Sequence, residues 1–201
     1  MIGLVRHGQT EWSENGRHTS VTDLALLPAG RQRAAGLAPV LAAEPVDHVL
    51  VSPRRRARET AQLAGFGERL EVSEDLAEWH YGDYEGLTTP QIRLLQPAWN
   101  LWRDGCPGGE SPAQVSERAD RVIARLLALE ARVLIFAHGH ILRALTARWL
   151  EAPLDLGDQL VLDPATLSRL GLEHGRRALL SWNARVDLAP AGAGAGAPAA
   201  L

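Results

Sequence analysis

Three short apolar runs that end abruptly in polar residues constrain this chain more than any other feature of its sequence. The runs and their endings are Ile2–Val5 before Arg6-His7-Gly8, Asp47–Val51 before Ser52-Pro53, and Val133–Ala137 before His138-Gly139-His140. The last run is apolar throughout, which is typical of a central strand covered on both faces. Helical segments separate the runs, so the pattern predicts an α/β fold, a three-layer α/β/α sandwich with a mostly parallel sheet.

The remaining segments have weaker signals. Ser52 and Pro53 predict an N-cap and a first helical residue, and Ser111 with Gln114 resembles a capping box. The expected helices are Pro28–Ala43, the segment after Ser52, Thr89–Leu95, Ser111–Leu129 and Ile141–Leu150, and the weaker expected strands are Thr166–Glu173 and Ala178–Trp182. The sequence predicts one domain over residues 1–188, and the Ala/Gly/Pro composition of residues 189–201 predicts a disordered tail.

Composition removes several classes of function. All 21 basic residues among the 201 are arginines, so the chain has no lysine for a Schiff base or a P-loop. The net charge of −3 argues against a nucleic-acid binder. No apolar run reaches the roughly 20 residues of a membrane span. Because Met1 leads straight into the apolar run without a basic segment, we expect no secretion signal. With Cys106 as the single cysteine, we expect a cytoplasmic protein without a disulfide.

Polar and titratable residues directly follow each of the three apolar runs. If the runs are parallel strands, these residues lie beyond the carboxyl ends of the strands, where such sheets bind their ligands. A neutral histidine is a good nucleophile, arginines bind phosphoryl oxygens, and a nearby acid can protonate a leaving group. Together these groups suggest phosphoryl transfer through a phosphohistidine. Taken singly each has an ordinary explanation, because a histidine at a strand end or an arginine run on a helix is often structural.

Four blocks of sequence occur in a fixed order along the chain. They are Leu4-Val5-Arg6-His7-Gly8-Gln9-Thr10-Glu11-Trp12, Ser52 to Ala61, Leu76 to Gly86, and Phe136-Ala137-His138-Gly139-His140. These blocks resemble the histidine phosphatase superfamily, which has the phosphoglycerate-mutase-like fold. The similarity runs from about Ile2 to Asn183, nearest to the branches of bacterial broad-specificity acid phosphatases and fungal sedoheptulose-1,7-bisphosphatase.

The resemblance implies a role for each matching residue. His7 would be the phosphorylated nucleophile, and Glu78 the general acid for the leaving group and then the base for water. Arg6, Arg56 and His138 would bind the phosphoryl oxygens. The substrate would be a small phosphorylated molecule, with no cofactor and no metal, and relatives of this kind are often homodimers. The pocket rim would include Gln9, Thr10, Ser13, Thr19, Tyr81, Gly139, His140 and Arg103, although a surface salt bridge is an equal alternative for Arg103.

Departures from the mutases favour hydrolysis. Ser13 and His140 stand where phosphoglycerate mutases have asparagine, and residues 97–110 lack the paired arginines that hold the mutase substrate. A cofactor-dependent phosphoglycerate mutase remains the first alternative, and a catalytically degenerate module that binds a phosphorylated ligand the second. A metal site built on His138 and His140 with Glu78 or Asp83 is a further alternative. Cys106 is a poor nucleophile candidate, because no arginine follows it closely.

Overall fold

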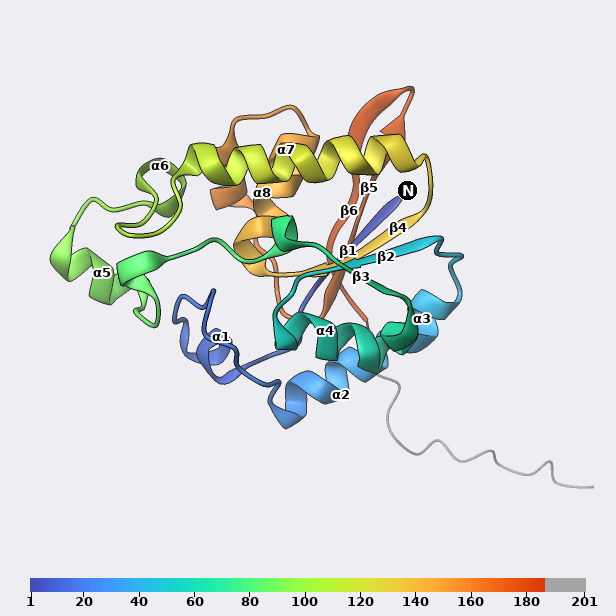
Figure 1. Cartoon of the computed structure of the whole chain (residues 1–201), viewed down its shortest axis with the longest axis horizontal. Coiled ribbons are helices and arrows are strands. Elements are labelled where there is room, and N and C mark those ends of the chain that lie inside the picture. Colours follow the sequence, from blue (N-terminus) through green and yellow to red (C-terminus); the bar gives the residue numbers. More distant parts are fainter. Residues whose placement is uncertain (187–201) are drawn as a thin grey trace, which may run out of the picture.

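The computed structural model describes residues 1–186, and the predicted tail at 189–201 lies outside this range. Its six strands form one sheet in the order β3-β2-β4-β1-β5-β6 (Figure 1). The neighbours from β3 to β1 are parallel, and β5 and β6 continue the sheet antiparallel. The mostly parallel sheet is therefore confirmed. The strands are β1 (Ile2–Arg6), β2 (His48–Val51), β3 (Leu70–Val72), β4 (Val133–Ala137), β5 (Thr166–Glu173) and β6 (Arg176–Arg185).

Helices cover both faces of the sheet, which completes the predicted three layers. Successive strand residues point to opposite faces, so Leu4 and Ile135 enter one core cluster while Val5 and Phe136 enter the other. The first face packs against α7 (Pro112–Leu129) and α8 (Gly139–Trp149), and the second against α3 (Ala38–Ala42) and α4 (Arg55–Ala61), with α2 (Pro28–Gly36) on the same side of the sheet. Each core residue of β4 is buried, as its apolar composition predicts.

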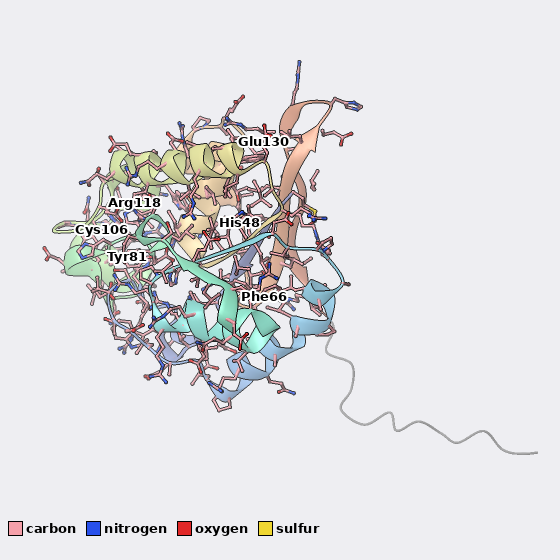
Figure 2. All side chains as sticks on the ribbon, turned by 45° about the vertical axis from the view of Figure 1, so that its right-hand side comes forward. His48, Phe66, Tyr81, Cys106, Arg118 and Glu130 are labelled. Atoms are coloured by element: carbon pink, nitrogen blue, oxygen red, sulfur yellow. The ribbon has the colours of Figure 1, made fainter. Side chains whose placement is uncertain are left out.

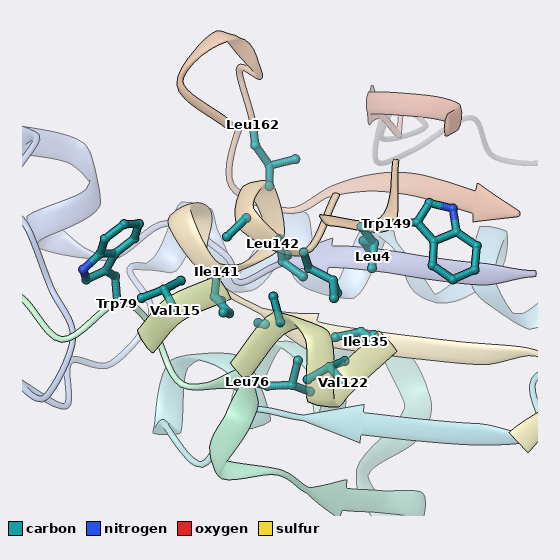
Figure 3. Packing of buried hydrophobic residues seen from close by; sticks show 14 of the residues in the cluster. Leu4, Leu76, Trp79, Val115, Val122, Ile135, Ile141, Leu142, Trp149 and Leu162 are labelled. Atoms are coloured by element: carbon teal, nitrogen blue, oxygen red, sulfur yellow. The ribbon is translucent and has the colours of Figure 1, made fainter. Parts of the chain in front are cut away.

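The helix α7 buries one stripe of its surface on the sheet. Val115, Ala119, Val122 and Leu126 are buried at helical spacing, and Figure 3 shows Val115 and Val122 near Ile141 and Ile135. Ser111 accepts a hydrogen bond from the Gln114 amide, while Gln114 binds the Ser111 amide in return. The predicted capping box is confirmed.

Two local expectations are wrong. The helix expected over Pro28–Ala43 is two helices, because Pro39 near the start of α3 has no N–H with which to continue α2. The helix expected after Ser52 begins at Arg55, with Arg54 as a cap that makes no side-chain bond. The Ser52 hydroxyl lies against His138 instead of capping a helix.

The segment between β3 and α7 closes over the sheet edge through short turns and small helices. These include a turn at Gly82–Tyr84, α5 (Thr89–Leu95) and α6 (Leu101–Asp104), the last inside a predicted loop. Gly82 has a φ of +52°, and a Cβ there would lie 2.1 Å from the Pro107 carbonyl oxygen. Figure 2 places Tyr81 and Cys106 at this end of the molecule, away from Glu130 at the end of α7. No helix within residues 1–186 has both the length and the apolar character that a membrane crossing requires.

Candidate active site

The carboxyl ends of β1, β2 and β4 bring the predicted catalytic groups together. Arg6 is in register with Ala137 across the parallel pair, and the His7 amide donates to the Ala137 carbonyl at 2.9 Å. The Ser52 amide donates to the Phe136 carbonyl at 3.0 Å, which sets the end of β2 beside the end of β4. The next residues along these strands therefore share one edge of the sheet.

A pocket of about 270 Å³ opens at this edge. Arg6, His7 and Glu78 line it, together with six of the predicted rim residues. Those six are Thr10, Ser13, Thr19, Tyr81, Gly139 and His140, and the wall also includes Gly16, Arg17, His18, Thr89, Arg143 and Leu162.

His7 is held as a neutral imidazole whose free nitrogen is Nε2. Its Nδ1 lies 2.7 Å from the Gly8 carbonyl oxygen, an acceptor, so Nδ1 carries the proton. Burial, followed by the charges of Arg56 and Arg6, lowers the pKa of His7 well below its usual value. The Gly8 amide donates to Thr60 Oγ1 at 2.9 Å, which fixes the loop that orients the ring. His7 thus has the lone pair that a nucleophile needs at neutral pH.

Arg6 presents a free donor beside His7. Its Nη1 donates to the Leu162 carbonyl, whereas its buried Nε has no hydrogen-bond partner within the described residues. A buried N–H of a guanidinium without an acceptor is costly, so this group suits an anion that enters the pocket.

Arg56 and His138 lie behind His7, and the protein itself engages their polar atoms. Arg56 Nε donates to His138 Nδ1 at 3.1 Å, so His138 carries its proton on Nε2 and donates it to Ser52 Oγ at 2.6 Å. Both side chains are fully buried, and neither lines the pocket. The ring of His138 meets that of His7 edge-on at 5.1 Å between centroids. The structure therefore brings both residues to the nucleophile, while their contact with phosphoryl oxygens stays a prediction.

Glu78 is a carboxylate bound by backbone amides. Oε1 accepts from the Trp79 and Ile141 amides, each at 2.9 Å, and Oε2 accepts from the His140 amide at 3.0 Å. Burial raises the pKa of Glu78, but the hydrogen bonds and charge of His140 and the charge of His138 outweigh it and hold the pKa well below its usual range. Two of these amides belong to the first turn of α8, where a negative charge is favoured.

A cluster of rings forms part of the pocket wall. The Tyr81 hydroxyl lies 2.7 Å from His140 Nδ1, and the ring of His18 packs 4.7 Å from that of Tyr81. Burial, followed by the nearby charge of His140, lowers the pKa of His18 to about 4, and burial with the charge of Glu78 raises the pKa of Tyr81 well above its usual value. Burial likewise lowers the pKa of His140. These rings are therefore uncharged at neutral pH.

The sequence did not single out three of the residues that line the pocket: His18, Arg17 and Arg143. Arg17 and His18 are neighbours in a polar loop and Arg143 lies within a helix, and neither place has a spacing that marks a site. Arg143 is held by its Nε, which donates to the Gly157 carbonyl at 2.7 Å, and it stacks over the Trp102 ring. Only the folding of distant segments around the pocket brings these residues to it.

Two predicted rim residues lie elsewhere. Gln9 turns to Glu14, with Nε2 3.3 Å from the carboxylate, and does not line the pocket. Arg103 is an exposed residue that pairs with the neighbouring Asp104 at 2.7 Å and donates to the Ala98 carbonyl. The structure therefore shows Arg103 in a surface ion pair, outside the residues that line the pocket.

The residues that the structure describes include no group of three or more His, Cys, Asp or Glu side chains arranged to hold a metal ion. The backbone amides on Glu78 and the Ser52 and Arg56 bonds to His138 occupy the atoms that a metal site at His138 and His140 would use.

Comparison with known proteins agrees with this geometry. The chain is 47% identical over 182 residues to an acid phosphatase of Mycobacterium tuberculosis, covering 88% of each chain. It is 37% identical over 178 residues to a sedoheptulose 1,7-bisphosphatase of Saccharomyces cerevisiae, covering 73% of this chain and 66% of that one. A solved structure of an open reading frame product from Mycobacterium tuberculosis superposes with a TM-score of 0.88 at 43% identity, covering 92% and 98% of the two chains. The profile of the histidine phosphatase superfamily (branch 1) matches residues 2–185, and the chain belongs to that superfamily.

Proposed function

We propose that the protein is a metal-independent phosphomonoesterase that works through a phosphohistidine on His7. The observation that carries this proposal is the neutral His7 ring, whose Nε2 is free in a pocket that also contains Arg6 and Glu78. Membership of a phosphatase superfamily and similarity to named phosphatases support the same reaction class.

In the first step, the Nε2 lone pair of His7 attacks phosphorus in line, and the ester P–O bond breaks. Arg6 Nε donates to a phosphoryl oxygen, while Arg56 supplies positive charge from behind. Glu78 is the acid that protonates the departing oxygen. Its carboxylate gains that proton as a phosphate dianion enters, because the added negative charge raises its pKa.

In the second step, the carboxylate of Glu78 takes a proton from water, and the oxygen of that water attacks phosphorus. The P–N bond to His7 breaks, and inorganic phosphate leaves with the ring neutral again. Glu78 holds its proton for the next cycle, so one residue acts first as acid and then as base.

The substrate that suits this pocket is a small phosphorylated metabolite such as a sugar phosphate. A volume of about 270 Å³ accommodates a small molecule, and Arg17 and Arg143 add positive charge beyond the phosphoryl site. The named activities of the relatives on a sugar bisphosphate and on a glucosyl phosphoglycerate support this class.

The direct test combines substrate screening with trapping of the intermediate. The protein is incubated with sugar phosphates, phosphoglycerates and nucleotides, and phosphate release is measured. A radiolabelled substrate should yield a phosphoenzyme that is labile in acid and stable in alkali, absent in His7→Ala and retained in His174→Ala, whose side chain is 92% exposed. Absence of turnover with binding retained would indicate a binding module, and isomerisation of phosphoglycerate with 2,3-bisphosphoglycerate would indicate a mutase.

We further propose a cytoplasmic homodimer. The buried free thiol of Cys106 suits a reducing compartment. Size-exclusion chromatography with light scattering tests the dimer, and fractionation of the producing cell tests the compartment.

A further inference from the structure

The segment Thr19–Thr22 is called the strap here. Carbonyl oxygens of the strap accept hydrogen bonds from the guanidinium of Arg56. Arg56 Nη2 donates to the Thr19 carbonyl at 3.0 Å and to the Ser20 carbonyl at 3.3 Å. Its Nη1 donates to the Thr22 carbonyl at 3.1 Å. The position of Arg56 therefore depends on the conformation of a loop that has no secondary structure of its own.

The Glu85 carboxylate accepts hydrogen bonds from the N–H groups and a hydroxyl of the strap, whereas Arg56 binds the carbonyl oxygens of the strap. Its two oxygens accept from the Ser20 amide at 2.9 and 3.0 Å, and Oε2 also accepts from the Ser20 hydroxyl at 2.8 Å. Oε1 accepts from the Thr22 amide at 3.0 Å. The Gly86 amide adds a bond to the His18 carbonyl at 2.8 Å, just before the strap begins.

We propose that Glu85 is a positioning residue for phosphoryl transfer, because it fixes the strap that holds Arg56. The N–H groups of the strap face the Glu85 carboxylate and its carbonyls face the guanidinium, and the Thr19–Ser20 peptide group joins the two opposite charges directly, by its N–H to Glu85 and its C=O to Arg56. Hydrogen bonds arranged in this way polarise and strengthen one another. The inference rests on the proposed function, since it assigns Glu85 to the reaction at His7.

The consequence of moving Arg56 reaches the nucleophile in two steps. Arg56 Nε fixes His138 by its 3.1 Å bond, and His138 packs edge-on against His7. Arg56 also places its charge near His7, where it helps to keep the ring neutral. A strap released from Glu85 would loosen the carbonyl acceptors of Arg56, and with them the orientation of His138.

The test compares four variants by kcat/KM, by calorimetric affinity for inorganic phosphate and by thermal midpoint. Glu85→Gln replaces one oxygen with an NH2 group that faces N–H donors, while Glu85→Asp keeps both oxygens on a shorter stem. Ser20→Ala removes one donor and leaves the amides. Glu59→Gln is the matched control, because Glu59 is a mostly buried carboxylate that binds the Leu26 amide and Arg31 without touching the strap.

We expect Glu85→Gln to lower kcat/KM and phosphate affinity by about 10- to 100-fold, the scale of a small displacement of catalytic groups. Glu85→Asp should recover most of this loss, Ser20→Ala should cost about threefold, and Glu59→Gln should lower only the thermal midpoint. In an Arg56→Gln background, Glu85→Gln should reduce phosphate affinity no further.

The proposal is overturned if Glu85→Gln, like Glu59→Gln, lowers only the thermal midpoint. It is also overturned if the double variant loses phosphate affinity by the product of the losses caused by Glu85→Gln and Arg56→Gln alone. Phosphate affinity does not require turnover. A wild-type protein without phosphatase activity would therefore refute the proposed function, while the titrations would still decide the role of Glu85.

Discussion

Replacing Glu78 by glutamine isolates the proton that the proposed mechanism assigns to it. The amide oxygen can keep the bonds from the Trp79 and Ile141 amides, as Oε1 does. The NH2 group would then face the His140 amide, which lies 3.0 Å from Oε2, so two donors would oppose each other. We expect the free energy of unfolding to fall by about 1–3 kcal/mol, which leaves a folded protein for kinetic study.

The kinetic loss should depend on the leaving group. An alkyl phosphate releases a basic alkoxide that needs the proton, so kcat/KM should fall roughly 10²–10⁴-fold, or about 2.7–5.4 kcal/mol at 1.36 kcal/mol per decade. An aryl phosphate such as p-nitrophenyl phosphate releases a stable phenolate, so its kcat/KM should fall by less than about tenfold. KM should change little for the alkyl substrate, and for the aryl substrate KM should fall together with kcat, because hydrolysis of the phosphoenzyme becomes rate-limiting.

A stopped-flow burst of nitrophenolate supplies a second measurement, because the variant also lacks the base that activates water. Phosphoenzyme should accumulate in Glu78→Gln on the aryl substrate. Equal losses of kcat/KM on the two substrates, or a loss confined to KM, would refute the assignment of Glu78 as the proton donor.

Four further outcomes are expected. Phosphatase activity should survive dialysis against EDTA, and its loss with recovery on adding a divalent metal would contradict the metal-independent mechanism. Arg103→Ala should keep kcat/KM within about twofold of the wild-type value, as expected for an exposed residue outside the pocket. A larger loss would indicate that Arg103 contacts the substrate. Because the pKa of His18 is about 4 when folded and 6.5 when unfolded, the unfolded chain binds more protons below pH 6.5. The free energy of unfolding should therefore decline as the pH falls from 6.5 towards 4, by up to roughly 3 kcal/mol for this residue, and urea denaturation of His18→Gln should show a shallower decline. Gly82→Ala should lower the thermal midpoint far more than Gly16→Ala. Both glycines have positive φ, but only at Gly82 would a Cβ lie 2.1 Å from the Pro107 carbonyl oxygen. Equal effects of the two substitutions would mean that this contact is relieved without cost.

The sheet was largely predictable because each apolar run stops where its strand stops. Arg6, Ser52 and His138 mark the ends of β1, β2 and β4 within one residue. The strand β3 was missed, since three residues at a sheet edge carry no periodicity and form a strand only by pairing with β2. Likewise, the break at Pro39 is a local rule, but composition alone favoured a longer helix.

The site divides in the same way. His7 and Glu78 could be named from their motifs, and both line the pocket. The burial of Arg56 could not be predicted, because a sequence does not reveal which hydrogen-bond acceptors surround a guanidinium. In the structure the carbonyl oxygens of the strap are these acceptors. His18 was missed because a lone histidine in a polar loop becomes part of a site only when Tyr81 packs on it.

The place of β4 between β1 and β2 has a consequence for the order in which the protein is built. β4 pairs with β1 on one side and β2 on the other, although both of those strands lie far earlier in the chain. The first two strands cannot adopt their final spacing until residues 133–137 have been synthesised and inserted between them. The pocket should therefore arise late during translation, and an amino-terminal fragment that ends before β4 should contain His7 and Arg56 without a site for phosphate.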